Sequence, residues 1–257
     1  EQDGIVLVLL AGGTFPMGAF AAEELTDDSE KPRRDVTISP FFLSKFETTQ
    51  AQWMRGAEGR NCANYRPDGA QGSVSAPKEK ATAVNPVESM SWIEADRWVR
   101  RIGLELPTEA QWEYACHDDD ITRFGPGDGR ADVEGFANVA GKESPFYRLL
   151  YGVPPAFDDT YVLHTPVGTF KASGFGLFDL HGNVGEWCRD AYARTLADAV
   201  PRSGDGLMVP RTDEGNRPVR GGTMQQDLHF ARCSARQQLP KTASRRDVGF
   251  RPARSLN

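Results

Sequence analysis

The chain has 257 residues, of which 39% are hydrophobic and 26% are charged, and its formal net charge is -6. A chain of this size and composition is globular and can bury a large core, and no apolar run in it is long enough to insert into a membrane. The acidic balance excludes a general nucleic-acid surface, because phosphate binding needs clustered Lys and Arg. We expect the Arg245-Arg246 pair and the scattered arginines to form solvated ion pairs.

The first half of the chain predicts strands and helices. Short apolar segments bounded by Gly and Pro indicate strands, for example over residues 5–10 and 36–43. A hydroxyl residue followed three positions later by Gln or Glu predicts helix starts after Thr49, Ser91 and Thr108. The second of these helices carries an apolar stripe that we expect in the core, formed by Trp92, Ala95, Val99 and Ile102.

Between these elements lie three long irregular segments that resemble insertions, over residues 56–83, 141–156 and 196–216. Loops of this length are uncommon in a compact protein unless they are functional or fixed by a metal. The acidic run at residues 118–120 has no evident partner and is expected to be solvated.

The four cysteines are far apart in sequence and include no C-x-x-C pair, which argues against a structural zinc site or a dithiol redox motif. The sequence starts at Glu1 without an initiator Met or an apolar leader. This start is consistent with a mature form after signal cleavage, and equally with a trimmed chain. We expect a periplasmic protein.

Six blocks in order along the chain carry a family resemblance. They are GGTFPMG from Gly12, FETT from Phe46, NPVE from Asn85 with Ser91-Trp92, LPTEAQWEYA from Leu106, GFGLFDLHGNVGEW from Gly174, and the segment from Arg220 to Arg251 with its RGG, RCSAR and GFR motifs. The chain resembles the formylglycine-generating enzyme family, also called sulfatase-modifying factors, almost from end to end. The resemblance implies an α+β fold: a single, elaborated C-type-lectin-like domain over residues 1–257 with little regular secondary structure.

The resemblance also implies a disulfide between Cys116 and Cys233, because family members with disulfides join the cysteines at these two places. Such a bridge points to an oxidising compartment. The alternative is two buried thiols that meet in the core.

Calcium is a further implication of the resemblance. One family site corresponds to Asn138, Val139, Asp159 and Tyr161, and a second corresponds to Asp179, Gly182, Val184 and Glu186. Oxygen ligands of this kind suit calcium, although either set is also compatible with a hydrogen-bonded turn that holds no metal.

The family's catalytic residues are missing. Formylglycine formation uses a pair of copper-binding cysteines, and the corresponding positions are Gln226 and Leu228, with no cysteine anywhere in residues 221–232. Neither side chain binds Cu(I), which prefers soft thiolates. Gly185 stands where the family usually has a Trp beside the reactive pair, so we expect a wider or reshaped surface there. The resemblance therefore predicts no copper and no enzymatic activity.

Histidines do not supply another catalytic centre. The related iron-dependent sulfoxide synthases need an H-x-x-x-H-x-E triad, and the four histidines of this chain are too far apart to form it. His181 stands where the family usually has an apolar residue, and His229 lies in the altered loop. We expect both to have packing or surface roles.

The sequence therefore predicts a non-catalytic protein that binds another protein through the old substrate groove. The expected binding residues are Met224, Gln225, Gln226, Asp227, Leu228 and His229. Family members without the cysteines include a periplasmic regulator of type VI secretion that acts on the outer portion of a membrane Ser/Thr kinase. The expected partner is accordingly the periplasmic region of such a kinase.

Two other classes of function stay open. The first is a hypervariable ligand-binding protein of a diversity-generating retroelement, whose binding surface would also include Gln237 and Gln238. The second is an accessory enzyme of chromophore or siderophore maturation with a site that no motif identifies.

Overall fold

The computed structural model describes residues 4–21, 23, 25–68, 80–118, 121–141 and 159–256. Its α-helices are α1 (Gln50–Gly56), α2 (Trp92–Arg101) and α3 (Glu109–His117), and its 3-10 turns are η1 (Asp28–Glu30), η2 (Leu196–Asp198) and η3 (Leu228–Ala231). The strands are β1 (Leu7–Leu10), β2 (Gly13–Met17), β3 (Arg34–Ile38), β4 (Phe41–Ser44), β5 (Ala137–Asn138), β6 (His181–Gly182), β7 (Gly185–Trp187), β8 (Ala199–Pro201), β9 (Met208–Pro210), β10 (Asn216–Arg220), β11 (Gln237–Pro240), β12 (Val248–Gly249) and β13 (Ala253–Ser255). The expected α+β class with few helices is confirmed.

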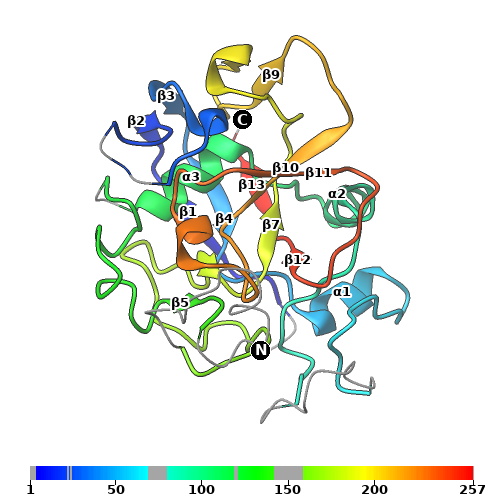
Figure 1. Cartoon of the computed structure of the whole chain (residues 1–257). Helices are drawn as coiled ribbons and strands as arrows, with labels where there is room; N and C mark the ends of the chain where they lie inside the picture. The colour runs from blue at the N-terminus through cyan, green and yellow to red at the C-terminus, as the bar shows by residue number, and fades with distance from the viewer. Residues whose placement is uncertain are drawn as a thin grey trace.

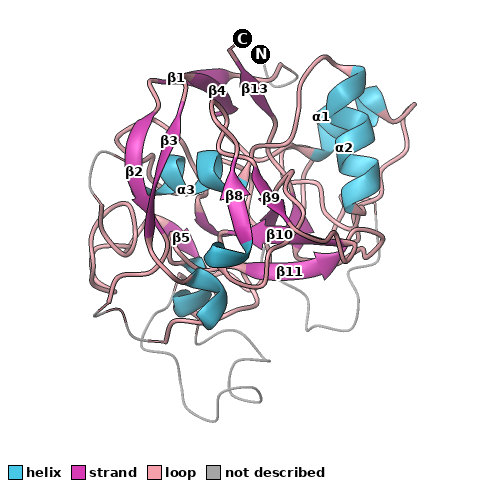
Figure 2. Ribbon diagram, turned by 90° about the horizontal axis from the view of Figure 1, so that it is seen from above, coloured by secondary structure: helices cyan, strands magenta, loops and turns pink. Residues whose placement is uncertain are grey.

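A four-stranded sheet in the order β11-β10-β7-β12 occupies the middle of the molecule, with α1 and α2 to one side and α3, β2 and β3 to the other (Figures 1 and 2). Strand β7 pairs antiparallel with β10 and parallel with β12, with Glu186 opposite Arg220. The sheet therefore joins the sequence block that ends at Trp187 to the C-terminal segment. A second sheet has the order β1-β4-β13, and the pairs β2-β3, β5-β6 and β8-β9 complete the strand pairing of the described residues.

The strand expected over residues 36–43 is instead two strands. β3 ends at Ile38 and pairs with β2, whereas β4 begins at Phe41 and pairs with β1 and β13. Pro40 lies between them, where it supplies no N–H for a ladder and fixes φ. The prediction of one strand was therefore wrong at this point.

All three predicted helix starts are confirmed. Thr49, Ser91 and Thr108 are N-caps whose side chains accept a backbone N–H, and each forms a complete capping box. In α2, Ala95 and Val99 are buried as expected, but Trp92 is half-buried and Ile102 is 41% exposed. Ile102 is the C-cap of the helix and so lies past the buried stripe.

The three predicted insertions have different outcomes. Much of the first and nearly all of the second fall outside the described residues. The third is not irregular, because it contains η2 and the β8-β9 hairpin, and its Leu196 and Met208 are buried in the core. The acidic run is described only at Asp118, whose carboxylate accepts the backbone N–H groups of Gly174 and Phe175.

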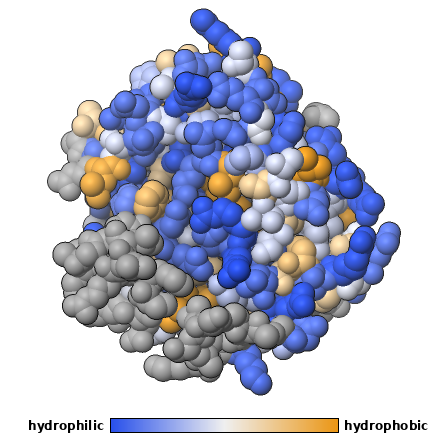
Figure 3. Space-filling view, turned by 45° about the vertical axis from the view of Figure 1, so that its right-hand side comes forward, coloured by the Kyte–Doolittle hydropathy of each residue, from blue (hydrophilic) through white to orange (hydrophobic). Residues whose placement is uncertain are grey.

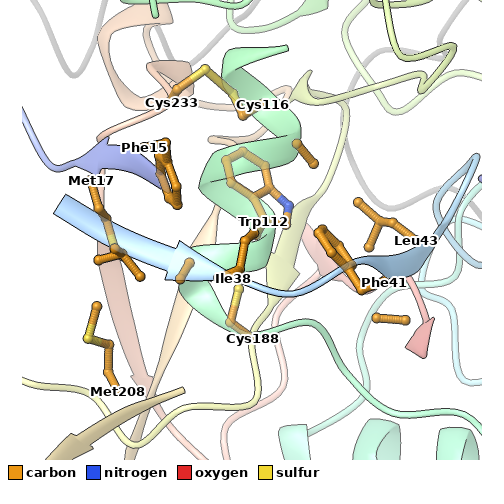
Figure 4. Close-up of a cluster of buried hydrophobic side chains, with 14 of the residues drawn as sticks. Phe15, Met17, Ile38, Phe41, Leu43, Trp112, Cys116, Cys188, Met208 and Cys233 are labelled. Carbon is orange, nitrogen blue, oxygen red and sulfur yellow. A yellow bond between two sulfur atoms is a disulfide. The ribbon is translucent and has the colours of Figure 1, made fainter. Parts of the chain in front are cut away.

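Two large apolar clusters form the core. Trp112 of α3 lies at the centre of the first, with Phe15, Met17 and Ile38 to one side and Phe41 and Leu43 to the other (Figure 4). The second packs Trp53 of α1 and Trp98 of α2 against Phe250, with the two indole rings stacked at 5.9 Å. These clusters fix α3 and the pair α1-α2 against the central sheet.

Four arginines of the C-terminal segment are buried in ion pairs, contrary to the expectation of solvated pairs. Arg220 pairs with Glu113, Arg232 with Glu23 and Glu30, Arg236 with Glu109, and Arg251 with Glu186. Arg236 donates to both Glu109 oxygens, at 2.8 and 2.7 Å. Each arginine lies in an RGG, RCSAR or GFR motif, so these motifs are part of the core.

Cys116 at the end of α3 and Cys233 after η3 form a disulfide, the pairing that the resemblance implies (Figure 4). The Cα atoms are 5.4 Å apart and the two residues are separated by 117 positions. Cys62 and Cys188 are free thiols. No helix among the described residues has the length and apolar character needed to cross a bilayer.

Replacing Arg236 with Met should destabilise the protein by about 3 kcal/mol or more, because the Glu109 carboxylate would stay buried without its main partner. Urea unfolding of wild type and variant measures this difference. The matched control is Arg194→Met, which breaks an exposed pair with Glu214 and should cost less than about 1 kcal/mol. Equal effects of the two substitutions would show that the buried pair is not a structural constraint.

Candidate functional site

The loop after β10 is shaped by two glycines. Gly221 and Gly222 have φ values of 93° and 68°, in the region that favours glycine. A side chain on Gly222 would meet the backbone of Phe230 and Ala231 at 2.9 Å. The carbonyl of Gly221 accepts the N–H of Gly182 at 2.7 Å. The chain therefore folds back tightly onto η3 and against the block around Asn183.

Only half of the predicted binding residues reach the surface. Met224 and Leu228 are 0% and 3% exposed, and Asp227 is also buried, so the side chains of these three residues face the interior. The other three, Gln225, Gln226 and His229, are half-buried. The buried side chains hold the loop in place, whereas the half-buried ones are accessible.

Asp227 and His229 form a local cap. Asp227 is the N-cap of η3, and its Oδ1 accepts the backbone N–H of His229 at 3.0 Å and lies 2.9 Å from His229 Nδ1. The His229 ring packs against the neighbouring Phe230, with ring centroids 3.9 Å apart. The half-buried His229 and Phe230 thus present one aromatic surface.

The two positions that correspond to the family's cysteines are filled by side chains with other partners. Gln226 exchanges two amide hydrogen bonds with Gln237 of β11, at 2.8 and 3.0 Å, and its carbonyl accepts the N–H of Ala140. Leu228 packs in an apolar cluster with Phe124, Val133 and others. An amide and an alkyl side chain cannot supply the thiolates of a Cu(I) site.

The surface at Gly185 is not widened by the absence of a side chain. It is buried, and a Cβ on it would meet a Val219 methyl at 2.8 Å and a Thr223 methyl at 3.3 Å. Neighbouring side chains therefore fill the space, and the surface is closed rather than widened at this point.

The first predicted calcium set is brought together. Asp159 accepts the backbone N–H of Val139 at 2.6 Å and that of Tyr161 at 2.9 Å. Asn138 donates through Nδ2 to Leu163 and Asn183, while its buried Oδ1 accepts no hydrogen bond within the described residues. A buried oxygen without a donor beside a carboxylate fits a hard cation. Asn138 and Asp159 would hold calcium through side-chain oxygens, and Val139 and Tyr161 through their carbonyls.

The second predicted set does not fit calcium in the same way. Arg251 donates to both oxygens of Glu186, at 2.7 and 2.6 Å, and Trp112 donates to one of them. Arg251 also donates to the carbonyls of Phe178 and Asp179. The guanidinium thus already supplies positive charge beside Glu186. We therefore propose calcium only for the first set.

Two further carboxyl groups lie near this arginine. Asp179 Oδ2 accepts the N–H of Gly168 at 2.7 Å, and Glu47 accepts from the Val184 N–H and the Asn183 amide. Burial raises the pKa of Asp179 to about 6, and burial with the nearby Asp179 and Glu186 raises the pKa of Glu47. With a pKa of about 6 Asp179 is mainly ionised near pH 7, and the guanidinium of Arg251 is the positive charge that acts on both carboxyl groups.

Several residues of the site were not predicted from the sequence. Asn183 links the first set to Glu47, because its Oδ1 accepts from Asn138 and Thr165 while its Nδ2 donates to Glu47. Tyr65 lies beside the loop and accepts from the Gln225 amide at 3.4 Å. These contacts join residues more than 100 positions apart in some cases, and no spacing within one motif indicates them.

The expectation for His181 is confirmed. It is a buried packing residue whose Nδ1 lies 2.9 Å from the carbonyl oxygen of Ala231 and whose ring meets Phe124 edge to face. Burial lowers the pKa of His181 to about 4.

A cavity of about 440 Å³ lies elsewhere, between Trp92, Arg189 and Met208. None of the predicted site residues lines it. The face shown in Figure 3 is mainly hydrophilic with separate hydrophobic spots.

Comparison with known proteins gives the family context of this geometry. Residues 2–256 match the family profile of the sulfatase-modifying factor enzyme 1-like domain. The formylglycine-generating enzyme of Mus musculus is 25% identical over 96% of this chain and 74% of its own length. The Ser/Thr protein kinase Pkn1 of Chlamydia trachomatis serovar L2 is 25% identical over 97% of this chain, which corresponds to 38% of the kinase.

Solved structures show the same fold. PvdO from Pseudomonas aeruginosa is 23% identical with a TM-score of 0.76, over 97% of this chain and 94% of that protein. Treponema denticola variable protein 1 is 18% identical with a TM-score of 0.72, over 97% and 95%. At these identities the likeness establishes the fold alone.

Calcium should stabilise the wild-type protein by about 2 to 3 kcal/mol at roughly 100 times its dissociation constant. Asp159→Asn should abolish this increment, because the substitution removes the carboxylate from the first set. Thermal unfolding with calcium and with a chelator measures the effect. Asp68→Asn, which alters an exposed carboxylate, is the control. An undiminished calcium response in Asp159→Asn would contradict the assignment.

The buried imidazole of His181 should make stability depend on pH. Its folded pKa of about 4 lies below the ordinary 6.5, so the unfolded chain binds the proton more tightly. The stabilisation is therefore complete above pH 6.5 and is lost as the pH falls towards 4. Unfolding free energy should drop by about 2 kcal/mol more in wild type than in His181→Leu between pH 7.5 and pH 5. Identical pH profiles for the two proteins would count against a neutral, buried His181.

Proposed function

The chain belongs to the sulfatase-modifying factor family, and we propose that it is a non-catalytic member that binds a protein outside the cytoplasm and regulates it. The observation that carries this proposal is the occupation of the family's two reactive positions. Gln226 is engaged with Gln237, and Leu228 is part of the core. No residue from 221 to 232 is a cysteine, so aligning the family motif a few positions earlier or later would not supply one. This loop therefore offers no thiolate that could bind Cu(I) for the activation of oxygen.

The surface left by these changes is suited to contact with a protein. We define the signature-loop surface as Gln225, Gln226, His229 and Phe230, all half-buried. Its aromatic pair offers a rigid apolar contact, and its amides offer hydrogen bonds. The loop beneath is fixed by Met224, Asp227 and Leu228, so little conformational entropy is lost when a partner binds.

A Ser/Thr kinase is the partner that the relatives support best. In the chlamydial kinase Pkn1, the stretch similar to this chain makes up 38% of a polypeptide that is named as a Ser/Thr protein kinase. We propose that the present chain contacts the periplasmic region of a membrane Ser/Thr kinase as a separate protein, as the resemblance to the type VI secretion regulator TagR implies. Calcium at the first set would act structurally, by joining Asn138 and Val139 to Asp159 and Tyr161, beside the contact that Ala140 makes with the Gln226 carbonyl.

The disulfide between Cys116 and Cys233 supports a place outside the cytoplasm, because such bonds persist in oxidising compartments.

The hypervariable binding protein is the weaker alternative. It would display eight diversified side chains, but Met224, Asp227 and Leu228 among them are buried and fix the loop. Free variation at these three positions would disrupt packing. An accessory enzyme remains an outcome of the experiment below, because binding of a biosynthetic enzyme or its substrate in place of a kinase would support it.

The double substitution His229→Ala and Phe230→Ala should weaken binding to the purified periplasmic kinase region by at least about tenfold, because buried aromatic contacts dominate interface energies. The kinase is first identified by capture from membrane fractions of the native organism, and its affinity is then measured by titration calorimetry. Thermal unfolding of the variant checks that the fold is retained.

Val200→Ala is the matched control, because Val200 is 72% exposed on the β8-β9 hairpin and is not part of the signature-loop surface. It should leave the affinity unchanged. A double variant that binds as tightly as wild type would contradict the assigned surface, and the absence of any membrane kinase among the captured proteins would contradict the assigned partner.

A further inference from the structure

A buried group of two sulfurs and an imidazole lies outside the signature-loop surface. The ligand atoms of Cys116, His181 and Cys233 all lie within 4.8 Å of one another, and the three residues are buried. They come from three separate elements: the end of α3, strand β6 and the segment after η3. In the oxidised protein the two sulfurs form the disulfide (Figure 4).

The hydrogen bonding of His181 prepares it as a ligand. Its Nδ1 lies 2.9 Å from the Ala231 carbonyl oxygen, and a carbonyl can only accept, so Nδ1 carries the proton. Nε2 therefore holds the lone pair. Metal-binding histidines commonly donate their other ring N–H to a carbonyl in this way, which fixes the tautomer and the ring orientation.

His181 Nε2 lies close to the end of α3. A Cβ built on Gly125 would collide with the Cys116 carbonyl oxygen and would lie 3.7 Å from His181 Nε2. The imidazole is neutral near pH 7, because burial lowers its pKa. His181 is moreover a departure from the resembled motif, which usually has an apolar residue here. Burial of an imidazole among apolar residues costs free energy that an apolar side chain would not.

We propose that, once the disulfide is reduced, Cys116, Cys233 and His181 form a binding site for a thiophilic divalent cation, with zinc as the best match. Two thiolates and one imidazole are a common zinc donor set, and the fourth position is taken by water. Two thiolate charges balance Zn²⁺, so the buried site carries no net charge. Zinc–sulfur bonds of about 2.3 Å require the sulfurs to separate.

A dithiol is the reductant that opens the Cys116–Cys233 disulfide. The dithiol gives two electrons and two protons, its own sulfurs form a disulfide, and the Cys116–Cys233 bond opens to two thiols. Zinc then displaces both thiol protons and forms two Zn–S bonds, while His181 Nε2 contributes its lone pair without releasing a proton. The same three residues would thus be a covalent cross-link in an oxidising compartment and a metal cross-link in a reducing one.

The test uses the full chain, freed of metal and titrated with Co²⁺ as the spectroscopic probe for zinc. One Co²⁺ per chain should bind after reduction with a phosphine, with a thiolate-to-cobalt charge-transfer band, and Zn²⁺ should displace it. The oxidised protein should show no such band. His181→Leu, which restores an apolar side chain, should form the disulfide normally but bind Co²⁺ at least about tenfold more weakly after reduction.

Cys62→Ser is the control and should bind Co²⁺ as wild type does, since Cys62 is a free thiol outside the group. Equal Co²⁺ affinity of reduced wild type and His181→Leu would overturn the proposal, as would binding to the oxidised protein with the same band. If reduction alone unfolds the chain, added Zn²⁺ should restore the native near-UV circular dichroism. Failure to restore it would also overturn the proposal.

Discussion

Buried ion pairs between the C-terminal segment and the rest of the chain are the constraint on which the structure depends. Arg220 and Arg236 meet Glu113 and Glu109 of α3, Arg232 meets Glu23 and Glu30, and Arg251 meets Glu186 of β7. Removal of one member of such a pair leaves an uncompensated buried charge, at a cost comparable to a large part of a protein's net stability. The pairs therefore fix helix α3, the N-terminal turn η1 and the central sheet in a single arrangement.

This constraint explains why the family motifs persist in a chain without the reactive cysteines. The arginines of RGG, RCSAR and GFR, together with the glutamates of LPTEAQWEYA and GNVGEW, hold the fold, and none of them depends on a thiol in the loop. The loop itself is held by Met224, Leu228 and the Asp227 cap, so Gln226 and Leu228 are accommodated without a gap. Motif and catalytic residues are thus separable, and the family resemblance specifies architecture rather than chemistry.

Local features were predictable from the sequence, whereas long-range contacts were not. Capping boxes at Thr49, Ser91 and Thr108 act over three residues, so the sequence pattern identifies them directly. The separation of β3 from β4 at Pro40 was also readable in principle from the chemistry of proline. The burial of Met224 and Asp227, the pairing of Arg251 with Glu186 and the filling of the space beside Gly185 depend on segments distant in sequence. No periodicity or spacing within one segment encodes such contacts.

The central claim is that this chain keeps the family's fold without the family's activity. An assay for oxidation of a cysteine in a peptide tests this claim most directly. The disulfide-bonded protein is incubated with Cu(I), oxygen and a cysteine-containing peptide substrate of formylglycine-generating enzymes, and the peptide is examined by mass spectrometry beside an active family member. The account predicts no formylglycine above the level of a protein-free control, because Gln226 and Leu228 cannot bind Cu(I). Enzyme-dependent conversion of the cysteine would contradict it and would place a catalytic site elsewhere in the fold.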